Sequence, residues 1–216
     1  MKDLYIIGAG GFGREVAWLA ERINHRKNEW KIKGFIDDNT QLHGRMEAGY
    51  PVLGGIDYFD EAADPEGWVV CAVGASIVRK KIIEKLNNKK NIHFATLIDP
   101  SALVSERVVI GEGSIICAGT IVTVDIEIGS HVIVNLDCTI GHDAKIRDFV
   151  TIYPSVNVSG FVTIEEQTEL GTGTQIIQGK TIGKETIVGA GSVVVKDLPE
   201  KCTAVGSPAK PIKYRE

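Results

Sequence analysis

The sequence has no excess of basic residues, no long apolar run and no cysteines at the spacing of metal ligands. With 24 Lys and Arg residues against 28 Asp and Glu residues the net charge is −4, so a nucleic-acid-binding surface is not expected. No segment reads as a transmembrane helix or a signal peptide, which predicts a cytoplasmic protein without membrane insertion. The four cysteines are therefore expected to be reduced and to bind no metal.

In place of these features, the second half of the sequence carries a repeat six residues long. Every sixth residue from Ile110 to Val194 is Ile, Val or Leu, and no insertion interrupts the series. From Ile110 to Val188, the position four residues after each anchor is small or β-branched, with Lys180 as the exception. A fixed short period predicts a stacked array in which each unit buries its apolar side against the next. The anchors are Ile110, Ile116, Val122, Ile128, Val134, Ile140, Ile146, Ile152, Val158, Ile164, Leu170, Ile176, Ile182, Val188 and Val194.

A period of six does not fit a helix, which would scatter the anchors around its circumference. It fits short extended segments joined by glycine-tolerant corners, so that inward residues recur once on each side of a prism. Glycine directly follows the anchor at six positions, as such corners would favour. Three sides make one coil, so residues 18 apart are expected to stack, in about five coils.

The first half of the sequence alternates short apolar strands with helical segments. Strands are expected at Leu4–Ile7, Ile32–Ile36 and Trp68–Gly74, with one helix after the first strand and another at Ser76–Leu86. This alternation predicts a small α/β domain with a parallel, Rossmann-like βαβαβ sheet. We therefore divide the chain into a small Rossmann-like domain at 1–95 and a β-helix domain with a C-terminal tail at 96–216.

A glycine-rich loop joins the first strand to the first helix. Gly8, Gly10 and Gly13 match the pattern G-x-G-x-x-G, and the acidic pair Asp37 and Asp38 follows the second strand. Such glycines let the backbone approach a pyrophosphate at the helix N-terminus, while a carboxylate after the second strand holds a ribose or a base. The pattern favours a nucleotide ligand over a merely structural turn, but it does not separate NAD from other nucleotides.

The repeat resembles that of the left-handed parallel β-helix acyltransferases, and its handedness is inferred from this resemblance. Gly8–Gly13, Phe35–Asp38 and Ala72–Gly74 with Arg79–Lys81 resemble the N-terminal domain of bacterial sugar acetyltransferases. That family includes UDP-4-amino-sugar N-acetyltransferases, perosamine N-acetyltransferases and the sialic acid O-acetyltransferase type. The resemblance implies that the small domain binds a nucleotide sugar. The residues expected to contact this substrate are Gly10, Gly11, Gly13, Asp37, Asp38, Gly74 and, in the repeat, Asn135.

His142 is the candidate catalytic base of the repeat domain. It lies two residues after the anchor Ile140, on an outer face of the prism, where a neutral imidazole is suited to general base catalysis. Asp143 follows it and can orient the ring. The resemblance supports this pair, since the family's motif is a histidine followed by an acidic residue, often Glu. The alternatives are a solvated histidine and an ordinary surface carboxylate, and His131 is expected to have no catalytic role.

Other residues of the repeat domain are candidates for binding the acyl donor. Gly160 lies 18 residues after His142 and should stack beside it, leaving room for a thioester and an N–H for the developing oxyanion. The segments Gly189–Asp197 and Ala204–Lys210 resemble the closing signature of coenzyme A-dependent hexapeptide transferases. The two lysines of these segments suit the phosphates of coenzyme A, or are solvated terminal charges. The residues expected to contact the acyl donor are Gly160, Thr172, Ala190, Lys196 and Lys210.

The sequence therefore predicts an acetyltransferase that uses acetyl-CoA as cosubstrate, needs no metal and acetylates the 4-amino group of a nucleotide-linked sugar in glycan or polysaccharide biosynthesis. Acetylation of a sugar hydroxyl and a non-catalytic nucleotide-binding scaffold remain as alternatives. A gamma-type carbonic anhydrase would need three histidines at one zinc site, and the repeat contains two. We also expect a homotrimer with each active site between neighbouring prisms, because the repeat has no insertion loop to enclose a pocket.

Overall fold

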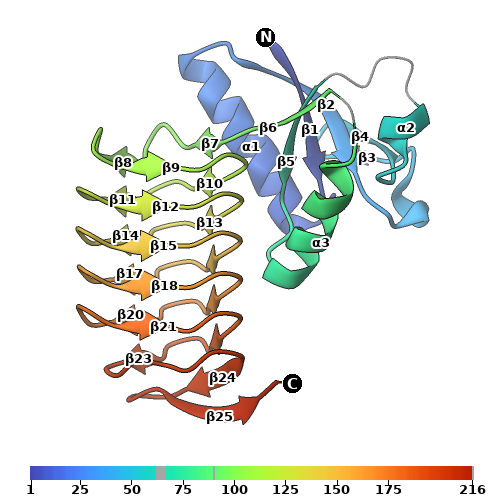
Figure 1. Ribbon diagram of the computed structural model, residues 1–216. Coiled ribbons are helices and arrows are strands. Elements are labelled where there is room, and N and C mark those ends of the chain that lie inside the picture. Colours follow the sequence, from blue (N-terminus) through green and yellow to red (C-terminus); the bar gives the residue numbers. More distant parts are fainter. Residues whose placement is uncertain (62–66, 90, 216) are drawn as a thin grey trace. The chain divides into compact units, whose positions relative to one another are not determined.

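The computed structural model describes residues 1–61, 67–89 and 91–215, and the chain divides into two compact units, Met1–Pro100 and Ser101–Glu216 (Figure 1). This division falls a few residues beyond the boundary expected from the sequence. None of the helices in the described part of the chain combines the length and the hydropathy of a membrane span.

The first unit is built on a six-stranded sheet. Its elements are β1 (Lys2–Ile7), α1 (Gly11–Arg26), β2 (Trp30–Ile36), the 3-10 helix η1 (Thr40–Leu42), β3 (Met46–Glu47), β4 (Tyr50–Gly54), α2 (Tyr58–Glu61), β5 (Gly67–Cys71), α3 (Ser76–Leu86), β6 (Ile92–Phe94) and β7 (Leu97–Ile98). The strand order is β3-β4-β2-β1-β5-β6, and the pairs are parallel except for the antiparallel edge pair β3–β4. The predicted α/β class is confirmed, and the sheet is mixed rather than purely parallel.

Glycines allow α1 to start close to the carboxyl end of β1. Gly8 has a φ of +97°, a conformation that side chains other than glycine's rarely adopt. A Cβ atom at Gly13 would collide with the carbonyl oxygen of Gly8, so the first turn of α1 lies directly against the loop. The helix then buries an apolar face that runs from Val16 to Ala20. The loop is thereby held at the carboxyl end of the central strand β1.

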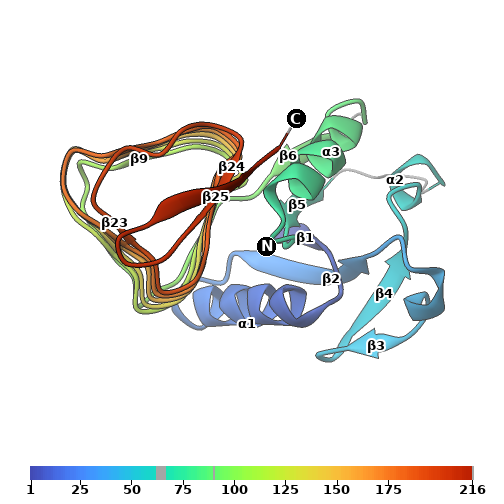
Figure 2. The same cartoon turned by 90° about the horizontal axis from the view of Figure 1, so that it is seen from below.

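The second unit is a parallel β-helix with a triangular cross-section (Figure 2). Its strands are β8 (Leu103–Val104), β9 (Val109–Ile110), β10 (Ile115–Ile116), β11 (Ile121–Val122), β12 (Glu127–Ile128), β13 (Ile133–Val134), β14 (Thr139–Ile140), β15 (Lys145–Ile146), β16 (Thr151–Ile152), β17 (Asn157–Val158), β18 (Thr163–Ile164), β19 (Glu169–Leu170), β20 (Gln175–Ile176), β21 (Thr181–Ile182), β22 (Ile187–Val188), β23 (Val193–Val194), β24 (Cys202–Val205) and β25 (Lys210–Tyr214). Strands 18 residues apart pair in parallel, as Ile121 does with Thr139. The predicted hexapeptide solenoid is confirmed.

The interior of the prism is filled by the anchors and by the small residues four positions after them. The anchors from Val122 to Val194 are each 3% exposed or less. Hydroxyls among the small residues donate hydrogen bonds to backbone carbonyls: Thr120 Oγ1 to Asn135 O and Thr168 Oγ1 to Gly183 O, both at 2.9 Å. Buried polar groups need such partners, so these hydroxyls are part of the packed core.

From Ile110 to Val188, the chain bends at the third residue after each anchor, where φ is positive. Glycines that directly follow the anchor have a different role: a Cβ at Gly141 would lie 2.7 Å from the backbone nitrogen of Gly160 on the next coil. The expectation that these glycines form the corners is therefore corrected, since they permit close stacking of coils while the third residue makes the bend. Residues other than glycine that have φ between +55° and +59° at this third position are Asp125, His131, Asp137, Asp143, Phe149, Ser155, Phe161, Gln167 and Glu185.

We predict that Thr120→Val lowers the free energy of unfolding by about 1–3 kcal/mol, because the buried carbonyl of Asn135 loses its donor while the shape of the side chain is kept. Chemical denaturation measures the change. Thr181→Val, at an exposed strand position, is the control and should stay within about 0.5 kcal/mol of the wild type. Equal effects of the two substitutions would contradict a structural role for the internal hydroxyl.

Candidate active site

Asp37 ties the glycine loop to the end of β2. Its Oδ2 accepts a hydrogen bond from the Ala9 N–H at 2.9 Å, and its Oδ1 accepts one from the Asn39 N–H at 2.9 Å. The His43 Nε2 lies 2.8 Å from the Asp37 carbonyl oxygen. Each carboxylate oxygen therefore already has a donor within the chain, and Asp37 fixes the loop that α1 follows.

Asp38 lines two cavities at the carboxyl ends of the central strands. The smaller cavity, about 210 Å³, extends to Gly8 and Val73, and the larger one, about 920 Å³, extends to His43 and Lys85. Asp38 Oδ1 accepts a hydrogen bond from a backbone N–H at 3.1 Å, which holds the carboxylate between the two cavities. Open α/β sheets bind their ligands at this edge, and the larger volume is in the range of small-molecule sites.

The predicted glycines also lie at the carboxyl ends of the strands, after β1 and β5. A Cβ at Gly10 or Gly11 would have no neighbouring atom within 4 Å in the described part of the chain, so packing alone does not demand glycine there. Both residues lie at the N-terminus of α1, where backbone N–H groups can receive an anion. Gly74 follows β5, and its carbonyl oxygen accepts a hydrogen bond at 2.9 Å from Nη1 of the buried Arg79.

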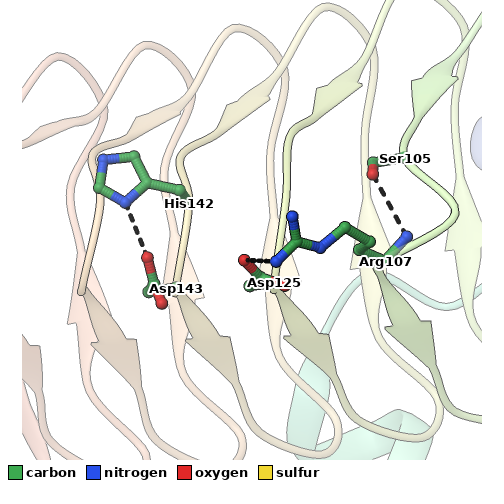
Figure 3. A network of polar contacts seen from close by, with 5 residues as sticks. All are labelled: Ser105, Arg107, Asp125, His142 and Asp143. Carbon is green, nitrogen blue, oxygen red and sulfur yellow. Dashed lines mark hydrogen bonds and ion pairs between the residues drawn. The ribbon is translucent and has the colours of Figure 1, made fainter.

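His142 and Asp143 occupy the corner between β14 and β15. The Nδ1 of His142 lies 2.9 Å from Oδ2 of Asp143 (Figure 3). Their side chains are 55% and 44% exposed, respectively. Asp143 has a φ of +59°, a conformation that Asp adopts more readily than most residues. The contact occupies Nδ1 and leaves Nε2 as the nitrogen that can take a proton from a substrate.

Two residues of the next coil surround the imidazole of His142. A Cβ at Gly160 would lie 2.6 Å from Cε1 and 2.7 Å from Nε2 of the ring, so the imidazole lies in space that only glycine leaves free. The ring of Phe161 meets the imidazole edge to face, with centroids 5.1 Å apart and planes at 88°. The stacking of Gly160 follows the predicted 18-residue spacing. Sequence reasoning missed Phe161, although the same spacing from Asp143 points to it.

A charged pair lies on the preceding coils of the same corner. Arg107 Nη2 donates to Asp125 Oδ2 at 2.6 Å, and Ser105 Oγ accepts from the Arg107 N–H at 3.2 Å (Figure 3). Asp125 is 18 residues before Asp143, so carboxylates occupy successive coils and Arg107 offsets the negative charge of one of them. Because the pair is exposed, it contributes little to stability.

The cysteines are not placed to act as nucleophiles. All four are buried. Burial raises the pKa of the Cys138 thiol to about 11, and it raises the pKa of the Cys71 thiol to about 11. These two thiols therefore stay protonated near neutral pH, and they are unreactive because the thiolate is the nucleophilic form.

Known proteins are similar to this chain in both fold and sequence. The family model described as the PglD N-terminal domain matches residues 3–86. The acetyltransferase domain of PglB from Neisseria gonorrhoeae is 33% identical with a TM-score of 0.88, over 98% of this chain and 100% of that one. A histidine-to-asparagine mutant of perosamine N-acetyltransferase from Caulobacter crescentus, solved in complex with CoA and GDP-perosamine, is 30% identical with a TM-score of 0.88, over 99% and 98% of the two chains. The chain belongs to the PglD family of nucleotide-sugar N-acetyltransferases.

A curated relative of this chain is UDP-N-acetylbacillosamine N-acetyltransferase from Bacillus subtilis. The two are 37% identical over 118 residues, which is 55% of this chain. The match covers 52% of that relative's own length, so the chain spans about half of it. The resemblance stated from the sequence is thereby confirmed at the level of the family.

The predicted binding residues of the repeat are divided between two corners of the prism. Gly160 and Lys196 lie at the corner of His142, with Lys196 three coils further on, and Lys210 begins β25. The corner that precedes β14, β20 and β23 carries Asn135, Thr172 and Ala190. Asn135 is 9% exposed, and its Oδ1 accepts a hydrogen bond from the backbone N–H that follows it. A single prism therefore does not bring all of these residues together.

We predict that Asp37→Ala lowers the free energy of unfolding by about 1.5–3 kcal/mol, since two backbone N–H groups lose a charged acceptor. Chemical denaturation followed by tryptophan fluorescence reports on the first unit, which contains Trp18, Trp30 and Trp68. Asp57→Ala, at an exposed position, is the control. If Asp37→Ala is as stable as this control, the carboxylate does not hold the loop.

Proposed function

We propose that this chain transfers the acetyl group of acetyl-CoA to the 4-amino group of a nucleotide-linked sugar in glycan biosynthesis. The observation that carries the proposal is the His142–Asp143 pair, with Nδ1 held at 2.9 Å and the ring lying over Gly160. The Neisseria domain has been solved in complex with acetyl coenzyme A, and the Caulobacter enzyme with CoA and GDP-perosamine. These complexes support both ligands for this chain.

His142 acts as the general base through Nε2. Asp143 accepts the hydrogen bond from Nδ1–H, which keeps Nε2 unprotonated and stabilises the imidazolium that forms. The substrate amine attacks the thioester carbon, a C–N bond forms, and Nε2 takes the proton from the amine. The C–S bond then breaks, and the imidazolium returns the proton to the departing thiolate of CoA. Each proton gained by the base is thus released in the same turnover.

The backbone N–H of Gly160 stabilises the tetrahedral intermediate. In the described part of the chain this N–H donates no hydrogen bond. The imidazole of His142 lies next to the same residue. A backbone donor fixed by the coil needs no reorganisation when negative charge develops on the carbonyl oxygen. The lack of a Cβ at this position also leaves access for the thioester.

The first unit binds the nucleotide of the sugar substrate. Gly10, Gly11 and Gly13 bring backbone N–H groups at the start of α1 to the phosphates. Asp38 contributes a carboxylate to the base or the ribose from the wall of the larger cavity. Asp37 acts indirectly by holding the loop, and Gly74 lies at the end of the neighbouring strand β5.

A homotrimer would bring the two corners of the repeat together. Asn135, Thr172 and Ala190 lie at one corner of a prism and His142 at another, so a corner of one prism facing a corner of its neighbour combines them. The acyl donor then lies between prisms, with Lys196 and Lys210 available to its phosphates. The exposed setting of His142 in the single chain fits a site completed by a second copy.

We expect light scattering at micromolar concentration to give a mass of about 70 kDa, three times the 23.4 kDa of one chain. Addition of acetyl-CoA should leave this mass unchanged. A chain that stays at 23.4 kDa while turning over substrate at its full rate would contradict a site shared between copies.

We predict that His142→Ala lowers kcat by about 10²–10⁴, the usual effect of removing a general base. Binding of acetyl-CoA by calorimetry and the Tm should change little, because the side chain is exposed. Asp143→Asn should lower kcat in the same direction but less.

His25→Ala, which removes an exposed histidine of α1, is the matched control and should keep wild-type turnover. Mass spectrometry with a panel of nucleotide amino- and hydroxy-sugars identifies the acceptor. Transfer to a hydroxyl sugar alone would replace the amine in the proposal, and a folded His142→Ala with more than about a third of wild-type kcat would remove His142 as the base.

A further inference from the structure

Phe161 adopts a backbone conformation that its side chain disfavours. Its φ is +58°, and the side chain is 61% exposed. A bulky residue in this left-handed region is an outlier, whereas Gly, Asn and Asp adopt it with less strain. At the equivalent position of the neighbouring coils this corner carries Asp125, Asp143 and Gly179. Neither backbone conformation nor burial therefore explains a phenylalanine here.

The contact that Phe161 does make is with the imidazole of His142. The two rings meet at 88° with centroids 5.1 Å apart, an arrangement that aromatic pairs favour. The Phe161 N–H also donates to the carbonyl oxygen of His142 at 2.9 Å, so the backbones of the two residues are fixed relative to each other. The backbone that carries the Phe161 ring is therefore held next to that of His142.

The surroundings of the imidazole show what this contact controls. Gly160 has no side chain to restrain the ring, and His142 is 55% exposed, so the ring has room to adopt other rotamers. Asp143 restrains it through one hydrogen bond at Nδ1. Phe161 supplies a second contact from the side, and two contacts fix an orientation that one hydrogen bond leaves free to pivot.

We propose that Phe161 is a positioning residue that holds the His142 imidazole with Nδ1 on Asp143 and Nε2 available to the acceptor. The proposal rests on the proposed function, in which His142 is the base. It assigns Phe161 an effect on kcat rather than on the binding of acetyl-CoA, since a general base must lie within hydrogen-bond reach of the proton it takes.

Phe149 provides a matched comparison within the same chain. It has the same backbone conformation, with φ of +59°, and its ring stacks on another histidine, His131, with centroids 5.2 Å apart and planes at 18°. His131 lies at a different corner and is buried. Replacing Phe149 therefore changes the same kind of backbone site and removes another phenylalanine–histidine contact without touching the base.

The test compares Phe161→Gly, Phe161→Tyr and Phe149→Gly in the full chain. Glycine accepts positive φ freely, so Phe161→Gly should fold with a Tm at least equal to that of the wild type. Its kcat should fall about tenfold, within the range known for a misplaced catalytic group, with the KM for acetyl-CoA within about twofold. Phe161→Tyr should restore kcat, and Phe149→Gly should leave it unchanged.

Three outcomes would overturn this assignment. Wild-type kcat in Phe161→Gly, alongside an inactive His142→Ala, removes the positioning role but keeps His142 as the base. A lower mass of Phe161→Gly in light scattering assigns the ring to contact between copies instead. An active His142→Ala refutes the proposed function itself, and the role of Phe161 fails with it.

Discussion

The hydrogen bonds between residues 18 apart are the constraint on which the second unit depends. Each two-residue strand pairs with the strand one coil on, and the same register is kept from β8 to β23. Every corner is thereby placed directly over the previous one, and an outward side chain meets the residues 18 before and after it. The position of His142 over Gly160 follows from this register and needs no loop or helix of its own.

The corners combine two demands that the repeat meets at different positions. The residue directly after the anchor must allow the next coil to approach closely, and glycine does so at Gly141. The third residue must adopt a positive φ, which costs Asp less than a bulky side chain. Asp143 thus meets the backbone requirement of the corner and accepts the hydrogen bond from His142, so structure and chemistry use the same residue.

A strict period makes much of this protein predictable. The anchors, the stacking of Gly160 beside His142 and the outward place of Asp143 follow from counting residues, because the coil length converts sequence spacing into distance. The α/β unit is less regular, and the edge hairpin β3–β4 was missed because a strand of two residues has too little pattern to detect. That both oxygens of Asp37 have donors within the chain depends on how the loop folds. Phe161 was missed because its role depends on a ring contact rather than on a motif.

The stacked corner that carries His142 also fixes the distance between His142 and Lys196. Lys196 lies three coils further along the same corner, after β23. Neighbouring strands of a sheet are about 4.8 Å apart, so the two backbones are separated by about 14 Å. The number of coils sets this separation, and side-chain packing does not. The prism is in this sense a molecular ruler, and removing one 18-residue coil between the two residues would shorten it by a single step while leaving both corners in register.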